Sequence, residues 1–192
     1  MRIIALAVAL ALTAPMATAQ TVDSRSAKKM LFGTSGSSAQ MGQAGFVDDA
    51  VAKAIKKAAS QIPYYGAIAV SPGEPVSSNL MSTMANYHSA EAAQQAALAN
   101  CNSRRTVGKP CVVIATITPK RFKPRGLTMS VEATKAFGKD YRRLKSPKGM
   151  AISPSTGVFG YDRGDGGRAV SRCNAAAAAK GAQDCRLVIS DQ

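Results

Sequence analysis

The chain contains few of the residues and motifs that enzymes and metal proteins use at their sites. Its 192 residues include one histidine, no tryptophan and only 5% aromatic residues. It has no Cys-x-x-Cys pair, no Gly-x-Ser-x-Gly turn and no glycine-rich phosphate loop followed by Lys and Ser or Thr. These absences argue against a zinc site, a redox dithiol, an α/β-hydrolase and a P-loop nucleotide site. We therefore expect no metal, no cofactor and no enzyme activity.

The single histidine, His88, would have to serve any nucleophilic site that needs an imidazole base. It directly precedes Ser89, a good N-cap for the Ala-rich helix that we predict between Ser89 and Cys101. A polar residue is ordinary at a helix start, so we interpret His88 as a surface or capping residue. The stretch 162–167 lacks the alternating acids and final Glu of a calcium loop, and we interpret it as a turn.

No apolar run is long enough to cross a bilayer, which needs roughly 20 apolar residues. The longest candidate, from Ile3 to Leu12, follows Arg2 and precedes Ala17-Thr18-Ala19. A charged start, a short apolar middle and a small-x-small site are typical of a secretory signal peptide. We therefore predict a periplasmic or secreted protein with no transmembrane span after cleavage. Export favours disulfides for the four cysteines.

Acidic residues are also scarce, with 11 Asp and Glu against 25 Lys and Arg, which gives a formal net charge of +14. Such a charge attracts anionic partners over long range. In a cell envelope these are lipid head groups or acidic glycans, whereas export argues against nucleic acid. The alternative is a generally basic surface that has no specific ligand.

Two segments about 80 residues apart have the same order of features. Ala69-Val-Ser-Pro72 matches Ala151-Ile-Ser-Pro154, and each is followed by a turn, an Ala-rich segment and a Cys before a β-branched strand. We predict an α+β fold with a duplicated strand-strand-helix-strand unit, whose mainly antiparallel sheet is covered by the Ala-rich helices. We expect the two units to pair edge to edge in one sheet. Burial under these helices is expected for Val112, Ile114, Leu187 and Ile189.

The four cysteines fall in the two copies as Cys101 and Cys111, and as Cys173 and Cys185. Four cysteines allow three connectivities. The repeat favours the two local pairs, each joining a helix to the strand that follows it.

Composition divides the chain into six segments. We expect a signal peptide at 1–19, a flexible segment at 20–45, an N-terminal helix at 46–63, a first repeat unit at 64–118, a basic linker with a helix at 119–147 and a second repeat unit at 148–192. The linker helix is predicted over 131–144, capped by Ser130.

The basic linker is the best candidate for a binding site. Its aromatics are interleaved with cations, as at membrane surfaces and polyanion sites. The candidate anion-binding residues are Lys120, Arg121, Lys123, Arg125, Arg142 and Arg143. The alternative is a solvated helix face that packs the aromatics Phe122, Phe137 and Tyr141 into the core.

The pattern Tyr65-Gly-Ala-Ile-Ala-x-Ser-Pro72, an Ala-rich helix ending in Cys and a second Cys before a Val-rich strand resembles the exported bacterial domain of unknown function 4189. Residues 65–117 carry the pattern, and 148–191 carry a partial second copy. The resemblance implies an α+β fold and export, but no established activity. Our leading hypothesis is a disulfide-stabilised, non-enzymatic envelope protein that binds an anionic surface or polymer. The alternatives are a cell-wall-acting enzyme or enzyme inhibitor, and a structural interaction module.

Overall fold

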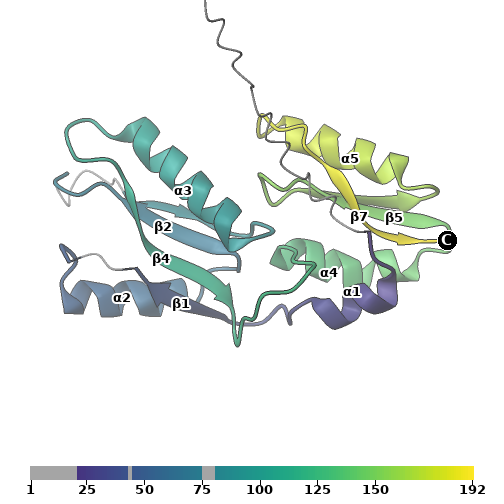
Figure 1. The fold of residues 1–192 in the computed structure, drawn as a ribbon, viewed down its shortest axis with the longest axis horizontal. Helices are drawn as coiled ribbons and strands as arrows, with labels where there is room; N and C mark the ends of the chain where they lie inside the picture. Colours follow the sequence, from purple (N-terminus) through teal and green to yellow (C-terminus); the bar gives the residue numbers. More distant parts are fainter. Residues whose placement is uncertain (1–20, 43–44, 75–80) are drawn as a thin grey trace, which may run out of the picture.

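Two antiparallel β-sheets flanked by helices form the part of the computed structural model that is described, residues 21–42, 45–74 and 81–192 (Figure 1). The fold is therefore α+β, as predicted. The expected signal peptide at 1–19 lies outside the described residues. The elements, in chain order, are α1 (Ser24–Met30), β1 (Ser37–Met41), α2 (Asp49–Ala59), β2 (Gly66–Val70), β3 (Ser82–Met84), α3 (Ala90–Arg104), β4 (Val112–Pro119), α4 (Val131–Lys139), the 3-10 helix η2 (Tyr141–Arg143), β5 (Lys148–Ile152), β6 (Phe159–Arg163), α5 (Gly167–Ala178) and β7 (Arg186–Asp191).

The first sheet has the strand order β1-β4-β2-β3. On one face, small side chains of β2 meet small side chains of α3, which lets the helix lie close to the sheet. These residues are Ala67, Ala69, Ala93 and Ala97. The other face is more bulky, because Ile68, Ile114 and Ile117 pack there with Ile55 of α2. The Ser89 side chain accepts a hydrogen bond from Ala92 N–H and caps α3, as predicted.

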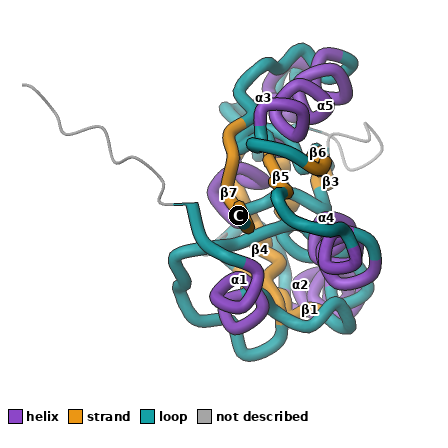
Figure 2. The backbone as a smooth tube through the Cα atoms, turned by 90° about the vertical axis from the view of Figure 1, so that its right-hand side faces the viewer, coloured by secondary structure: helices purple, strands orange, loops and turns teal. Residues whose placement is uncertain are grey.

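The second sheet has the strand order β6-β5-β7. Helix α5 covers one face through Ala169 and Cys173, which pack on Ala151. Gly160 of β6 makes this close approach possible, because a Cβ there would lie 2.5 Å from the backbone nitrogen of Cys173. The opposite face holds the larger core, in which Met150 and Ile189 pack with side chains of α1 and α4. Figure 2 shows α3 and α5 on one side of the strands and α1, α2 and α4 on the other.

The two units share local details as well as element order. The pairing of β2 with β4 shifts register between Ile68 and Ala69, and that of β5 with β7 shifts between Met150 and Ala151. In both units the residue after the helix cysteine is an asparagine, and its side chain accepts the N–H of the strand cysteine. The Asn102 bond to Cys111 measures 3.0 Å, and the Asn174 bond to Cys185 measures 3.1 Å. Descent of both units from one duplicated segment stays a prediction that these parallels support.

The expectation that the units share one sheet is wrong. The outer edge of β4 is occupied by β1, with Ser37 opposite Pro119 and Met41 opposite Ala115. At the second sheet, Val22 forms a parallel bridge to Ile189 of β7. Because the N-terminal segment takes both edges, the repeat units cannot pair there with each other.

The predicted burial of four strand residues under the Ala-rich helices holds in part. Leu187 packs beside Cys173 of α5. Ile114 and Ile189 are buried on the opposite faces, toward α2 and α4. Val112, at the start of β4, is 39% exposed. Ile114 follows Val113, which packs on the α3 side, so alternation turns Ile114 to the opposite face. Alternation would put Leu187 and Ile189 on one face, but the register shift between Met150 and Ala151 gives β7 an extra residue there and turns Ile189 to the other face.

The segment 20–45, expected to be flexible, contains α1 and β1. Asp23 caps α1 by accepting hydrogen bonds from Arg25 N–H and Ser26 N–H. Strand β1 alternates buried Ser37 and Ala39 with exposed neighbours. The Gly- and Ser-rich composition suggested a linker, but small alternating residues also suit a strand that packs closely on a helix.

Candidate functional site

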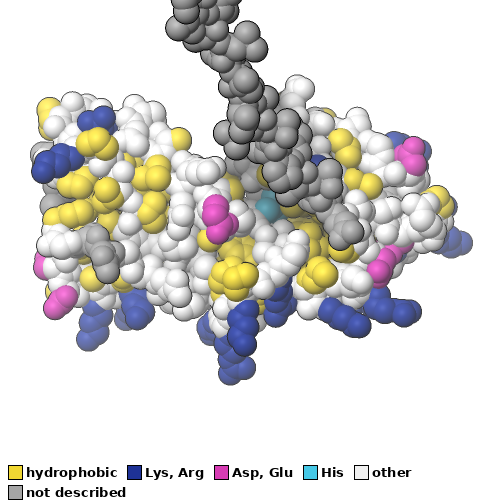
Figure 3. Space-filling view, in the orientation of Figure 1, with side chains coloured by type: hydrophobic (Ala, Val, Ile, Leu, Met, Phe, Trp, Pro, Cys, Tyr) yellow, Lys and Arg dark blue, Asp and Glu magenta, His cyan; other side chains and the backbone are white. Residues whose placement is uncertain are grey.

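Exposed lysines and arginines gather along one edge of the molecule. Figure 3 shows their side chains projecting from the lower edge, where Figure 1 places α2, the end of β4 and α1. Helix α2 contacts β1, and β1 pairs with β4, while Arg125, after the turn that ends β4, donates to the carbonyl oxygens of Met30 and Leu31 at the end of α1. We define the basic edge as eight of the exposed cations on these elements and on the turn after β4. They are Lys28, Lys29, Lys53, Lys56, Lys57, Lys120, Arg121 and Lys123.

Three of the six predicted anion-binding residues fall in the basic edge. Lys120, Arg121 and Lys123 are exposed in and after the turn that ends β4. Arg142 and Arg143 are also exposed, but they lie in η2, beyond α4. The sequence treated all six residues as one segment, whereas the structure places four of them in the turn and loop after β4 and two in η2.

Arg125 has a different local role. Its Nη1 donates to the carbonyl oxygens of Met30 (2.6 Å) and Leu31 (3.1 Å), and its guanidinium lies 3.8 Å from the ring centroid of Phe32. Carbonyls at a helix C-terminus lack intrahelical partners and carry partial negative charge. Arg125 therefore caps the C-terminus of α1.

The aromatics of the linker pack against other aromatic rings. Phe137 and Tyr141 are buried and stack with ring centroids 5.8 Å apart. Phe122 is 37% exposed and lies against Phe32 and Tyr65. The interpretation that the aromatics pack into the core describes Phe137 and Tyr141, whereas Phe122 stays partly accessible beside the cations of the basic edge.

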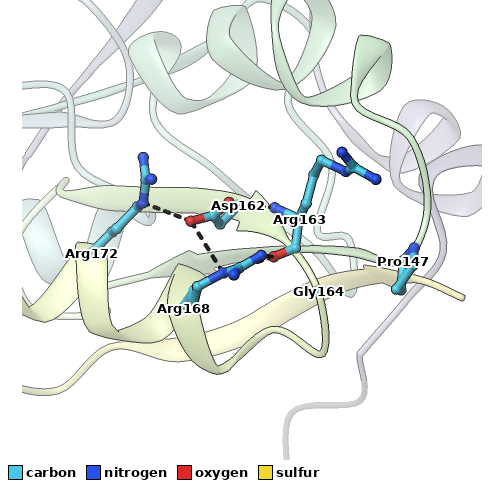
Figure 4. Close-up of a pocket in the computed structure, with 6 residues that line it drawn as sticks. All are labelled: Pro147, Asp162, Arg163, Gly164, Arg168 and Arg172. Carbon is cyan, nitrogen blue, oxygen red and sulfur yellow. Dashed lines mark hydrogen bonds and ion pairs between the residues drawn. The ribbon is translucent and has the colours of Figure 1, made fainter.

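A second basic feature lies between β6 and α5, where an open pocket of about 540 Å³ is lined by Pro147, Asp162, Arg163, Gly164, Arg168 and Arg172 (Figure 4). We call it the arginine pocket. Arg168 and Arg172 are four residues apart, so they project from the same side of α5. Both face Asp162 of β6, whose Oδ2 lies 2.8 Å from Nε of Arg172 and 3.6 Å from Nε of Arg168.

Sequence reasoning did not identify the arginine pocket. It interpreted the stretch 162–167, which contains Asp162 and Asp165, as a turn and not as a calcium loop. The spacing of Arg168 and Arg172 was visible in the chain, but their partner lies on the preceding strand. That contact depends on the close approach of α5 to β6 at Gly160.

We predicted that His88 is a surface or capping residue, but its side chain is buried, with 2% exposed. Its Nε2 lies 2.8 Å from the carbonyl oxygen of Val158, and its Nδ1 accepts the N–H of Ser130 at 3.0 Å. Burial lowers the pKa of His88 to about 4, so the ring is neutral at pH 7, with a proton on Nε2. Both ring nitrogens are therefore used in joining the first unit to α4 and the second unit.

A buried charged network lies beside β5. Lys148 Nζ donates to the carbonyl oxygens of Tyr141 (3.3 Å) and Leu144 (3.0 Å) and lies 3.8 Å from Asp191 Oδ2. The Tyr141 hydroxyl and Ser24 also donate to Asp191. Burial alone would raise the pKa of Asp191, but these hydrogen bonds and Lys148 lower it below its usual value. The network ties α1 and η2 to the second sheet.

The described part of the chain has few other features that would point to chemistry. It holds no group of three His, Cys, Asp or Glu arranged for a metal ion. No helix in the same residues has the length and apolar character needed to cross a membrane. Disulfides join Cys101 to Cys111 and Cys173 to Cys185, the two local pairs that the repeat favours.

Comparison of the chain with the models of known protein families, with curated proteins and with solved structures found no match. The resemblance to the domain of unknown function 4189 therefore stays a prediction, and the function has to be argued from the chain itself.

Proposed function

We propose that the protein is an exported, non-enzymatic envelope component that binds an anionic surface or polymer through the basic edge. The observation that carries the proposal is the gathering of Lys and Arg along one edge by elements distant in sequence (Figure 3). The two disulfides support an oxidising compartment outside the cytoplasm, either periplasmic or extracellular. The net charge of +14 favours an anionic partner in that compartment. Lipid head groups and acidic glycans are the anions expected there.

The arrangement suits an extended ligand better than a small one. Exposed lysines are hydrated and flexible, so each contact with an anion contributes little. Several such contacts made by one polymer or membrane act together, because each bound group raises the effective concentration of the next. Binding through the basic edge should therefore need many charges on the ligand and should weaken steeply with salt.

Charge reversal at matched positions tests the proposal. Lys56→Glu combined with Lys120→Glu changes two cations of the basic edge, whereas Arg104→Glu combined with Lys180→Glu changes two exposed cations on α3 and after α5. Both double variants lower the net charge by the same amount. We expect the first to bind vesicles of anionic phosphatidylglycerol at least fivefold more weakly than the second, in co-sedimentation at low salt. Circular dichroism checks that both remain folded.

Equal losses in the two variants would mean that net charge alone attracts the vesicles, and the basic edge would be abandoned. Equal binding to neutral and anionic vesicles, or binding unaffected by salt, would remove the anionic ligand as well. An acidic polysaccharide used in place of the vesicles separates a glycan ligand from a lipid surface.

A further inference from the structure

The arginine pocket has an excess of positive charge in a small space. Asp162 pairs with Nε of both Arg168 and Arg172, whereas the guanidinium of Arg163, which also lines the pocket, points away from Asp162 (Figure 4). Arg168 also donates to the carbonyl oxygen of Arg163 through Nε, at 3.1 Å, and through Nη2. Counted over the lining residues, three arginines and one carboxylate give a formal charge of +2, of which the Asp162, Arg168 and Arg172 group contributes one.

The same contacts orient the guanidinium groups without covering them. The side chains of Arg168 and Arg172 are 67% and 68% exposed, although both form ion pairs with Asp162. Among the described residues, no hydrogen bond engages either Nη of Arg172. In Figure 4 the end of the Arg172 side chain points away from Asp162 and the sheet. A guanidinium held at Nε with free Nη groups is prepared to bind an oxyanion through two parallel hydrogen bonds.

The surroundings of the pocket are fixed by backbone contacts. Gly164 N–H donates to the carbonyl oxygen of Pro147 at 2.6 Å, which joins the turn after β6 to the start of β5. The disulfide at Cys173, next to Arg172, anchors α5 to the start of β7. The pocket also opens beside the first turn of α5, whose backbone dipole favours negative charge. Little reorganisation is therefore needed when an anion binds.

We propose that the arginine pocket binds the phosphate group of a small phosphorylated molecule. The positive formal charge of the lining and the donor groups of Arg172 favour a phosphomonoester dianion over a monoanionic carboxylate. A volume of about 540 Å³ lies within the usual range of small-molecule sites, about 300–1,000 Å³, so it leaves room for an organic group next to Pro147. The site shares no residue with the basic edge and does not depend on that proposal.

Nuclear magnetic resonance titration of the oxidised, uniformly 15N-labelled protein tests the inference, with inorganic phosphate as the probe and acetate as the monoanionic comparison. Phosphate should saturate shifts of backbone amides within 163–172 and of the Nε–H signals of Arg168 and Arg172. Arg172→Gln should weaken phosphate binding at least tenfold. Arg172→Lys keeps the charge but loses the planar guanidinium that donates two parallel hydrogen bonds, so it should weaken phosphate binding several-fold. Arg104→Gln, an exposed arginine of α3, should leave it unchanged.

Several outcomes would overturn the inference. These are shifts that spread over the basic surface without saturating by 50 mM phosphate, acetate binding as tight as phosphate binding, and an Arg172→Lys variant that binds like the wild type. The double variant Lys56→Glu and Lys120→Glu should keep its phosphate site. Failure of the basic edge and failure of the arginine pocket are thereby separated.

Discussion

Mild acid should destabilise the protein through His88, which joins the two units. Burial is the main reason that the pKa of this imidazole falls to about 4, while an unfolded histidine titrates near 6.5. The charge of Asp184 works against the shift, and that of Lys180 adds to it. Between the two pKa values the unfolded chain binds a proton that the folded chain does not. The free energy of unfolding therefore falls as the pH drops through 6.5, and the loss is complete below about pH 4.

The magnitude follows from the two pKa values. Linkage gives a loss of about 2 kcal/mol between pH 7 and pH 5, and about 3 kcal/mol by pH 4. The carboxylates affect the free energy of unfolding at lower pH than His88 does. Burial opposes the shift at Asp184, but hydrogen bonds from Ser153 and Ser155 lower its pKa below 3.8. Its contribution to stability is therefore present above that value and is lost only as the pH falls further.

Urea unfolding followed by far-ultraviolet circular dichroism at pH 7, 6 and 5 measures the effect, since the chain has no tryptophan for fluorescence. The control is His88→Gln, whose amide can still donate to Val158 but does not titrate. We expect this variant to be less stable at pH 7 by about 1–3 kcal/mol, because the Ser130 N–H loses its acceptor. Its stability should change little between pH 7 and 5. The same pH dependence in both proteins would refute the reasoning, because His88 is the only histidine.

Three further predictions concern the disulfides, the buried lysine and η2. Peptide mapping without reductant should find Cys101 joined to Cys111 and Cys173 to Cys185, and replacing either pair by serine should lower the free energy of unfolding by roughly 2–4 kcal/mol. A bond that crosses between the units would contradict the pairing. Lys148→Met should cost about 1–3 kcal/mol in urea unfolding, because the carbonyl oxygens of Tyr141 and Leu144 lose their donor and the partly buried Asp191 loses its cation; a loss below about 0.5 kcal/mol would show that the network contributes little. Reversing Arg142 and Arg143 to Glu, outside the basic edge, should weaken binding to anionic vesicles no more than Arg104→Glu combined with Lys180→Glu does, and a larger loss would add η2 to the binding surface.

Local signals predicted much of the secondary structure. Helix α3 follows a serine cap and consists largely of alanine, and β4 is rich in β-branched residues. Helix α2 begins with Asp48 as its cap and Asp49 in the first turn, and Lys56 and Lys57 lie in its last turn. Each of these features acts within a few residues, so the sequence alone makes it visible.

Contacts between distant residues explain what the sequence did not reveal. Strand β1 pairs with β4 some 80 residues later, and no local signal indicates that pairing. The burial of His88 likewise depends on Val158, a residue of the other unit. The arginine pocket required Asp162 and Arg172 to meet across a strand–helix interface. In all three cases the residue types were apparent, but their partners were set by tertiary packing.

The N-terminal segment explains how two separate sheets form one body. Val22 pairs with β7 of the second unit, α1 packs on the core of that unit, and β1 then crosses to pair with β4 of the first unit. The predicted signal peptide would be removed after residue 19, which leaves Val22 and every later contact in place. The segment covers the free edges of β4 and β7, so neither strand offers that edge to another chain, and the short strand β1 becomes the outer strand of the first sheet. A short segment that seemed a linker by composition therefore determines both the separation of the sheets and their attachment to each other.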